Sequence, residues 1–188
     1  KIVIGYGGSM SHVASFMASG VNEALSGVVQ KRKNVMVLVC GDKRVWDNLP
    51  VPNHRKAHQN YMRSVWWGKA LRQFDIGLAP LARFYDHRRS AIKSEEYSLM
   101  GIPFVATHSR VYEDFEANNV GVYVSNGDYD GIPFEKRVGE WEIALLDMVD
   151  NLPEWKKRAA SWIDYGMEWD VDRNARKILS LYEEIATL

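Results

Sequence analysis

Short apolar runs alternate with longer stretches of helical periodicity along most of this chain, and this alternation is its strongest constraint on fold. The runs are 2–6 (IVIGY), 35–40 (VMVLVC), 76–81 (IGLAPL), 103–107 (PFVAT) and 120–124 (VGVYV). Runs that are apolar almost throughout are typical of parallel strands covered on both faces. We therefore predict an α/β fold, a Rossmann-like parallel sheet with helices on both faces.

Helical periodicity fills the segments between these strands and the C-terminal part. We predict helices over residues 12–32, 60–74, 90–100 and 111–118, and loops over 42–58 and 84–89, the first with room for a short strand. Apolar stripes recur beyond residue 139, and we expect them to lie in the core. We assign 1–138 to the α/β core and 139–188 to C-terminal helices of the same single domain.

The composition argues against several classes of protein. Lys plus Arg and Asp plus Glu each number 24, so bulk positive charge does not attract nucleic acid or a membrane surface. Cys40 is the only cysteine, which rules out an intramolecular disulfide and a zinc site built on several thiolates. With no secretory signal and no apolar run near the roughly 18 residues of a span, we expect a cytoplasmic protein without a membrane span. Because the chain begins with Lys1 directly before a strand, we also expect a fragment of a longer protein.

The first strand is followed by a glycine-rich turn that contains Gly7, Gly8 and Ser9. Ligands of open parallel sheets bind beyond the carboxyl ends of the strands, and glycine lets a backbone approach a phosphate closely. The helix that follows has no acidic residue before Glu23, which suits an external anion at its start. An ordinary strand-to-helix turn is the alternative. His12 either touches the ligand or is an exposed loop histidine.

A second loop, after the strand at 76–81, concentrates positive charge. Arg88 and Arg89 precede a predicted helix, and Lys93 lies in its first turn. Cations at a helix N-terminus oppose the helix dipole, so they also indicate a bound anion. The alternative is a solvated basic face.

Glu96 lies beside the buried stripe of that second helix, where an unpartnered carboxylate is costly. It either pairs with Lys93, three residues earlier, or accepts hydrogen bonds from two adjacent hydroxyl groups such as those of a ribose.

The segment 75–107, DIGLAPLARFYDHRRSAIKSEEYSLMGIPFVAT, resembles the donor-binding signature of retaining GT-B glycosyltransferases of the group 1, GT4-like kind. In that family a strand ending in aPL is followed by a loop, KS-x-x-K, and E-Y-x-x-x-G-x-P. The matching positions are Arg89-Ser90, Lys93, Glu96-Tyr97, Gly101 and Pro103. The opening IGYGGSMSH and the helix around Trp141 are also similar to the family. The resemblance covers most of this chain but only the C-terminal half of such an enzyme.

The resemblance implies a role for each matching residue. Gly7, Gly8 and Ser9 would lie against the sugar or diphosphate of a nucleotide sugar. Lys93, with Arg89, would neutralise the diphosphate leaving group, and the backbone after Ser90 would donate to phosphate. Glu96, beside Tyr97, would hold the ribose hydroxyls.

One position departs from the family. The more widespread motif has a second glutamate eight residues before the one at Glu96, and Arg88 stands there. Asp86 is the candidate replacement for that contact with the donor sugar. The acceptor, a sugar or glycoconjugate, would bind an N-terminal domain that this chain does not contain.

We therefore expect the donor-binding domain of a glycosyltransferase, which transfers sugar with retention and needs no cofactor or essential metal. Two D-x-D triplets, at 128–130 and 170–172, are more readily explained as a turn and a helix start than as metal sites. A non-catalytic nucleotide-binding module is the alternative function. A receiver-type interaction domain fits less well, since a glycine turn replaces the acidic cluster after the first strand.

Overall fold

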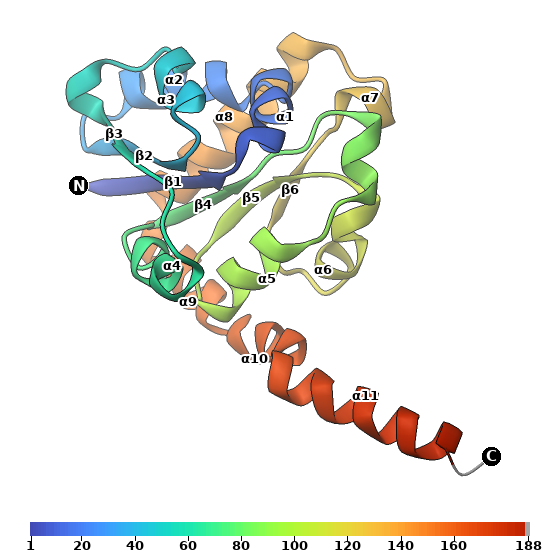
Figure 1. The fold of residues 1–188 in the computed structure, drawn as a ribbon. Helices are drawn as coiled ribbons and strands as arrows, with labels where there is room; N and C mark the ends of the chain where they lie inside the picture. Colours follow the sequence, from blue (N-terminus) through green and yellow to red (C-terminus); the bar gives the residue numbers. More distant parts are fainter. Residues whose placement is uncertain (187–188) are drawn as a thin grey trace.

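The computed structural model describes residues 1–186, with the side chains of Asp128 and Tyr129 outside the described part. Its centre is a six-stranded sheet in the order β3-β2-β1-β4-β5-β6, and every pair of neighbouring strands is parallel (Figure 1). The strands are β1 Ile2–Gly8, β2 Val35–Gly41, β3 Lys56–Gln59, β4 Ile76–Ala79, β5 Phe104–Thr107 and β6 Val122–Val124. The predicted α/β, Rossmann-like fold class is confirmed.

Helices cover both faces of the sheet. They are α1 Val13–Ala18, α2 Val21–Lys31, α3 Lys43–Asn48, α4 Ser64–Leu71, α5 Ile92–Leu99, α6 Glu113–Ala117, α7 Gly127–Asp130, α8 Phe134–Asp150, α9 Leu152–Ala160, α10 Ile163–Gly166 and α11 Val171–Ala186. One core lies between the sheet and α1, α2, α3 and α8, and the other lies on the side of α4, α5, α6 and α9. The strands are apolar on both sides because each side faces one of these cores.

Several predicted boundaries were wrong, for identifiable local reasons. The helix predicted over 12–32 is two helices, because Gly20 adopts a φ of 87° between them. In the segment 42–58 the short strand is β3, whereas the helix α3 was not predicted; the side chain of Asp42 caps α3 by accepting from the Arg44 amide at 3.0 Å. The loop predicted over 84–89 contains the 3₁₀ helix η3, Phe84–Arg88.

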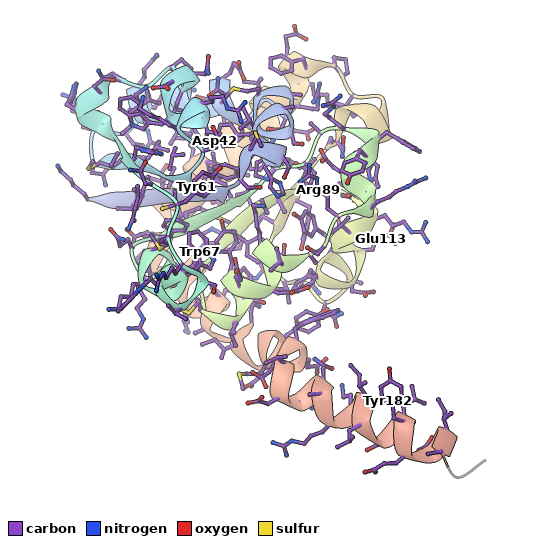
Figure 2. All side chains as sticks on the ribbon, in the orientation of Figure 1. Asp42, Tyr61, Trp67, Arg89, Glu113 and Tyr182 are labelled. Atoms are coloured by element: carbon purple, nitrogen blue, oxygen red, sulfur yellow. The ribbon has the colours of Figure 1, made fainter. Side chains whose placement is uncertain are left out.

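The C-terminal stripes divide into buried and exposed parts. Trp141, Leu145 and Met148 of α8 are fully buried, as predicted. The stripe of α11 is not core: Ile178, for example, is 54% exposed. The reason is visible in Figures 1 and 2, where α11 extends away from the sheet and carries Tyr182 into solvent. Within residues 1–186, no helix combines the length and apolar composition that a bilayer crossing requires.

Candidate functional site

The strand order reverses between β1 and β4, and the loops that follow these two strands form the candidate site. After β1 the chain turns toward α1, which covers one face of the sheet, and after β4 it passes through η3 to α5, which covers the other. Such a switch point opens a crevice at the carboxyl edge of the sheet, where open α/β folds bind ligands. Both loops singled out in the sequence meet at this crevice.

The aromatic rings that pack on the β1 turn leave no room for a Cβ there, whether or not a ligand binds. A Cβ built on Gly7 would lie 2.2 Å from the Trp67 ring, and one built on Gly8 would lie 2.5 Å from the Tyr6 hydroxyl. Gly41 follows β2 with a φ of 111°, and its Cβ would meet the Gly8 carbonyl oxygen. Close packing of the turn therefore explains glycine here independently of a phosphate.

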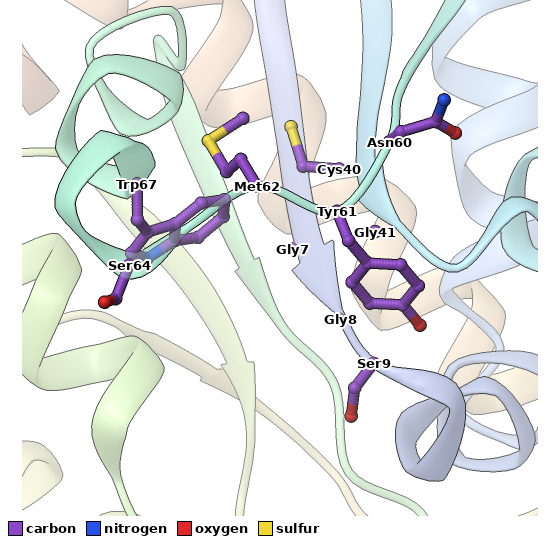
Figure 3. A pocket seen from close by; sticks show the side chains of 10 residues that line it. All are labelled: Gly7, Gly8, Ser9, Cys40, Gly41, Asn60, Tyr61, Met62, Ser64 and Trp67. Atoms are coloured by element: carbon purple, nitrogen blue, oxygen red, sulfur yellow. The ribbon is translucent and has the colours of Figure 1, made fainter.

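A pocket of about 290 Å³ opens beside this turn (Figure 3). It extends from the ends of β1 and β2 to the segment between β3 and α4, with Tyr61 on one side and Trp67 on the other. Its lining residues are Gly7, Gly8, Ser9, Cys40, Gly41, Asn60, Tyr61, Met62, Ser64 and Trp67. A site with ring and glycine walls and few charges suits a flat, partly apolar ligand group.

Arg89 joins the two loops of the crevice. Its Nη2 donates to the Ser11 carbonyl oxygen at 2.6 Å, and its Nη1 lies 3.0 Å from Nδ1 of His12. Its Nε donates to the Asp86 carboxylate at 2.6 Å. The side chain is only 15% exposed, so its positive charge is fixed at the junction of the loops.

Asp86 is a buried anchor for this arrangement. One carboxylate oxygen binds Arg89, and the other accepts from the backbone amides of Ala82 and Arg83, each at 3.0 Å. Burial raises the pKa of Asp86, but hydrogen bonds from these amides and from Ser15, together with the charge of Arg89, lower it overall. The structure thus places the Asp86 carboxylate inside the loop, where it orients Arg89.

Lys93 and His12 belong to the same charged cluster. Burial lowers the pKa of Lys93 to about 8, against the opposing effect of Glu96. Burial also lowers the pKa of His12 to about 4, assisted by the charges of Lys93 and Arg89. His12 is therefore neutral at pH 7 and accepts a hydrogen bond from Arg89. The α5 start is less basic than expected, because Glu95 shares its first turn with Lys93.

Glu96 connects α5 to the pocket. Its carboxylate accepts a hydrogen bond from the Trp67 side chain, and burial raises its pKa although Trp67 and Lys93 act in the opposite direction. Among the described residues, no carboxylate lies within 4 Å of the Lys93 ammonium, so the alternative pairing of Glu96 with Lys93 is not formed. The Lys93 charge is left available to an anion.

The other predicted residues are a buried tyrosine and two exposed side chains. Tyr97 is buried in the core, where its hydroxyl donates to the Leu78 carbonyl at 3.1 Å. Arg88 is exposed, with its guanidinium 5.9 Å from the Phe84 ring centroid. Ser90 is also exposed, directly after Arg89. Tyr61, Met62 and Trp67 were not predicted as site residues. Tyr61 and Met62 lie in the loop before α4, within the helix expected over 60–74, and Trp67 was expected on the packed stripe of that helix.

No group of three or more metal-ligating side chains occurs among the described residues. Asp170, in the second D-x-D triplet, accepts hydrogen bonds from the Asp172 and Arg173 amides at the start of α11. In the first triplet, the side chain of Asp128 lies outside the described part.

Neither a protein-family model nor a curated protein sequence matches this chain. Solved structures do match it, at low sequence identity. Anabaena HepE in complex with UDP and glucose matches with a TM-score of 0.71 and 14% identity, over 100% of this chain and 49% of HepE. WaaG, a glycosyltransferase involved in lipopolysaccharide biosynthesis, matches with a TM-score of 0.63 and 17% identity, over 87% of this chain and 43% of WaaG.

This chain shares its fold with a part of each of these proteins. It spans about half the length of HepE and less than half of WaaG. A Listeria monocytogenes protein described as a UDP-N-acetylglucosamine 2-epimerase also matches, with a TM-score of 0.58 and 15% identity over 85% of this chain and 39% of that protein. Similarity at this level establishes the fold, while the chemistry must be argued from the site.

Proposed function

We propose that this chain is the donor-binding domain of a glycosyltransferase that takes a nucleoside-diphosphate sugar and transfers its sugar with retention of configuration. The observation that carries the proposal is the meeting of two cations, Arg89 and Lys93, with the glycine turn at the switch point of the sheet. HepE, solved with UDP and glucose, and the glycosyltransferase WaaG share this fold, which supports the same assignment.

The charge of the cluster matches the leaving group. Breaking a glycosyl–phosphate bond leaves a nucleoside diphosphate and an electron-deficient sugar carbon. Fixed cations aimed at the departing oxygens stabilise that charge without reorganisation. Arg89 is held in place by Asp86 and Ser11, and Lys93 has no ion-pair partner among the described residues. We propose that these two side chains supply the positive charge, so that no divalent metal is essential.

The pocket and Glu96 suit the nucleoside. Glu96 lies beside Trp67, which lines the pocket, so a nucleoside in the pocket would bring its ribose within reach of this carboxylate. A carboxylate accepts from both hydroxyl groups of a ribose. Tyr61 and Trp67 offer flat apolar walls for the base. We propose that the acceptor, a sugar or glycoconjugate, binds a separate domain on the open side of the crevice.

One observation favours a second candidate, a nucleotide-binding module that transfers no sugar. Arg88, exposed and 5.9 Å from the Phe84 ring centroid, stands where the resembled family has a glutamate, and the Asp86 oxygens are occupied inside the loop. The donor sugar therefore has no carboxylate partner at the expected position.

Calorimetric titration tests the proposal directly. The chain would be titrated with uridine, guanosine and adenosine diphosphates, with their sugar esters, and with the matching monophosphates, in EDTA and in Mg²⁺. We expect one base to be preferred, its diphosphate to bind more tightly than its monophosphate, and EDTA to have no effect. Equal affinity for diphosphate and monophosphate would contradict the proposal. Binding of the free diphosphate with no affinity for any sugar ester would favour the non-catalytic module.

A further inference from the structure

The zero net charge of the chain conceals a strong local asymmetry. Residues 48–74 contain no Asp or Glu, although the whole chain has 24 of them. The same segment contains five cations. Arg55 and Lys56 are used internally: Arg55 donates to the Val35 carbonyl at 2.7 Å, and Lys56 donates to the Trp46 carbonyl at 2.8 Å. The other three cations, Arg63, Lys69 and Arg72, are exposed on and beside α4.

These three cations have no neutralising partner nearby. Among the described residues, none of them lies within 4 Å of a carboxylate. The Lys69 ammonium instead lies over the Trp66 ring, 3.8 Å from its centroid. Like charges gathered without counter-charges repel one another, so the cluster is most favourable when it faces an external anionic partner.

The outward face of α4 is also apolar. Its inward side places Ala70 and Leu71 in the core. On the outward side, Val65 is 77% exposed and Trp66 is 49% exposed. The α4 face, defined here as Arg63, Val65, Trp66, Lys69 and Arg72, thus combines an indole, an aliphatic side chain and three exposed cations.

We propose that the α4 face docks on an anionic membrane surface. Tryptophan favours the level of the lipid headgroups, and nearby Lys and Arg are attracted to anionic lipids. Contacts with a phosphodiester backbone would use the cations but not Val65, and the three cations are few for nucleic-acid binding. A bilayer interface accounts for the exposed apolar side chains as well as the cations. This inference does not depend on the proposed sugar transfer.

Docking through α4 would hold the candidate site near the bilayer. Ser64 and Trp67 belong to the same helix and line the pocket beside the glycine turn. The α4 face itself contributes no residue to that pocket or to the Arg89 cluster. Nucleotide binding and membrane binding can therefore be measured and removed separately.

Vesicle co-sedimentation provides the test. The chain would be mixed with vesicles of pure phosphatidylcholine and with vesicles that also contain phosphatidylglycerol. We expect binding only to the anionic vesicles, weakened by salt. The double variant Lys69→Glu/Arg72→Glu replaces two of the three cations. It should lower the vesicle-binding constant at least about 30-fold, because each cation near an anionic surface adds to the affinity. Trp66→Ala should lower it about tenfold, as expected for a large side chain that is partly buried in the interface.

Matched variants on other faces serve as controls. Lys33→Glu reverses one charge, as each substitution of the double variant does, at an exposed site beyond α2, and Ile143→Ala removes an exposed apolar side chain from α8. Both should bind vesicles like the unmodified chain, and circular dichroism would show all variants folded. No binding to anionic vesicles, equal binding to both compositions, or the same loss in Lys33→Glu as in the α4 variants would overturn the proposal. So would binding to RNA or heparin without binding to vesicles.

Discussion

The Ser11 carbonyl oxygen accepts a hydrogen bond of 2.6 Å from Nη2 of Arg89, which ties the loop after β1 to the loop after β4. These residues are far apart in the sequence, and the contact fixes the shape of the crevice between the two halves of the sheet. The backbone thus holds the guanidinium, and the charge of Arg89 is directed toward the site before any ligand arrives. Such preorganisation is what stabilises a developing negative charge efficiently.

Nucleotide affinity should depend on pH through Lys93. Burial lowers the pKa of this ammonium to about 8, and a bound diphosphate favours its protonated form. Affinity should therefore change little from pH 7 to 8 and decrease as the pH rises further, by up to about tenfold per pH unit. The ligand's own phosphate ionises near pH 6 and adds no slope in this range. Calorimetry from pH 7 to 9.5 measures the effect.

Lys93→Arg is the matched control, since arginine stays protonated throughout this range. Its affinity should be independent of pH. An equal slope in both proteins would assign the pH dependence to a different group.

The Glu96 carboxylate should distinguish ribose from deoxyribose. Glu96→Gln keeps the shape of the side chain but removes the charge that strengthens hydrogen bonds from hydroxyl groups. We expect it to weaken binding of the ribonucleoside diphosphate by about 1.5–3 kcal/mol and to weaken the 2′-deoxy form less. Equal losses for both ligands would show that Glu96 acts only through its hydrogen bond with Trp67.

Asp86→Asn should destabilise the η3 loop. The variant loses the charge-assisted bond to Arg89, and we expect a loss of about 1.5–3 kcal/mol in the free energy of unfolding at pH 7. Because folding lowers the pKa of Asp86, its contribution is complete above about pH 4 and is lost as the pH falls through the lower folded-state value. Urea unfolding should therefore show that the free energies of unfolding of the unmodified chain and of Asp86→Asn become more similar at acidic pH.

Asp150→Asn removes an exposed partner of Arg32 and serves as the control for Asp86→Asn. Its stability should stay close to that of the unmodified chain. A loss as large as that of Asp86→Asn would contradict a special role for the buried carboxylate.

Gly7 should be intolerant of even a methyl group. Gly7→Ala would place Cβ 2.2 Å from the Trp67 ring, and we expect a loss of about 1–3 kcal/mol in the free energy of unfolding. Gly68→Ala is the matched control, since its Cβ meets no atom within 4 Å in α4 and should stabilise the helix by about 0.5–1 kcal/mol. Equal effects of the two substitutions in urea unfolding would refute the tight packing of Trp67 on the turn.

Strand composition carried most of the fold prediction. The runs that begin at Ile2 and Val35 are apolar throughout because both faces of the sheet are covered, and this pattern is local enough to be recognised in a sequence. Breaks within helices were harder to predict, since the break at Gly20 depends on a left-handed backbone conformation in an otherwise helical pattern.

The candidate site was predictable only in part. Arg89, Lys93 and the glycine turn were identified because cations at a helix start and adjacent glycines are local signals. The hydrogen bond between Trp67 and Glu96 joins elements far apart in the chain, so no spacing indicates it. The exposure of α11 was unpredictable for a related reason, since an apolar stripe shows that a helix needs a partner but not whether that partner is in the same chain.

Above all, we propose that the Lys93 ammonium binds the diphosphate group of a nucleotide. Its most direct test is calorimetric titration of the unmodified chain and Lys93→Ala with the preferred nucleoside diphosphate and its monophosphate. We predict that Lys93→Ala weakens diphosphate binding by about 1.5–3 kcal/mol and removes most of the preference over monophosphate. An unchanged diphosphate titration in Lys93→Ala would contradict the account.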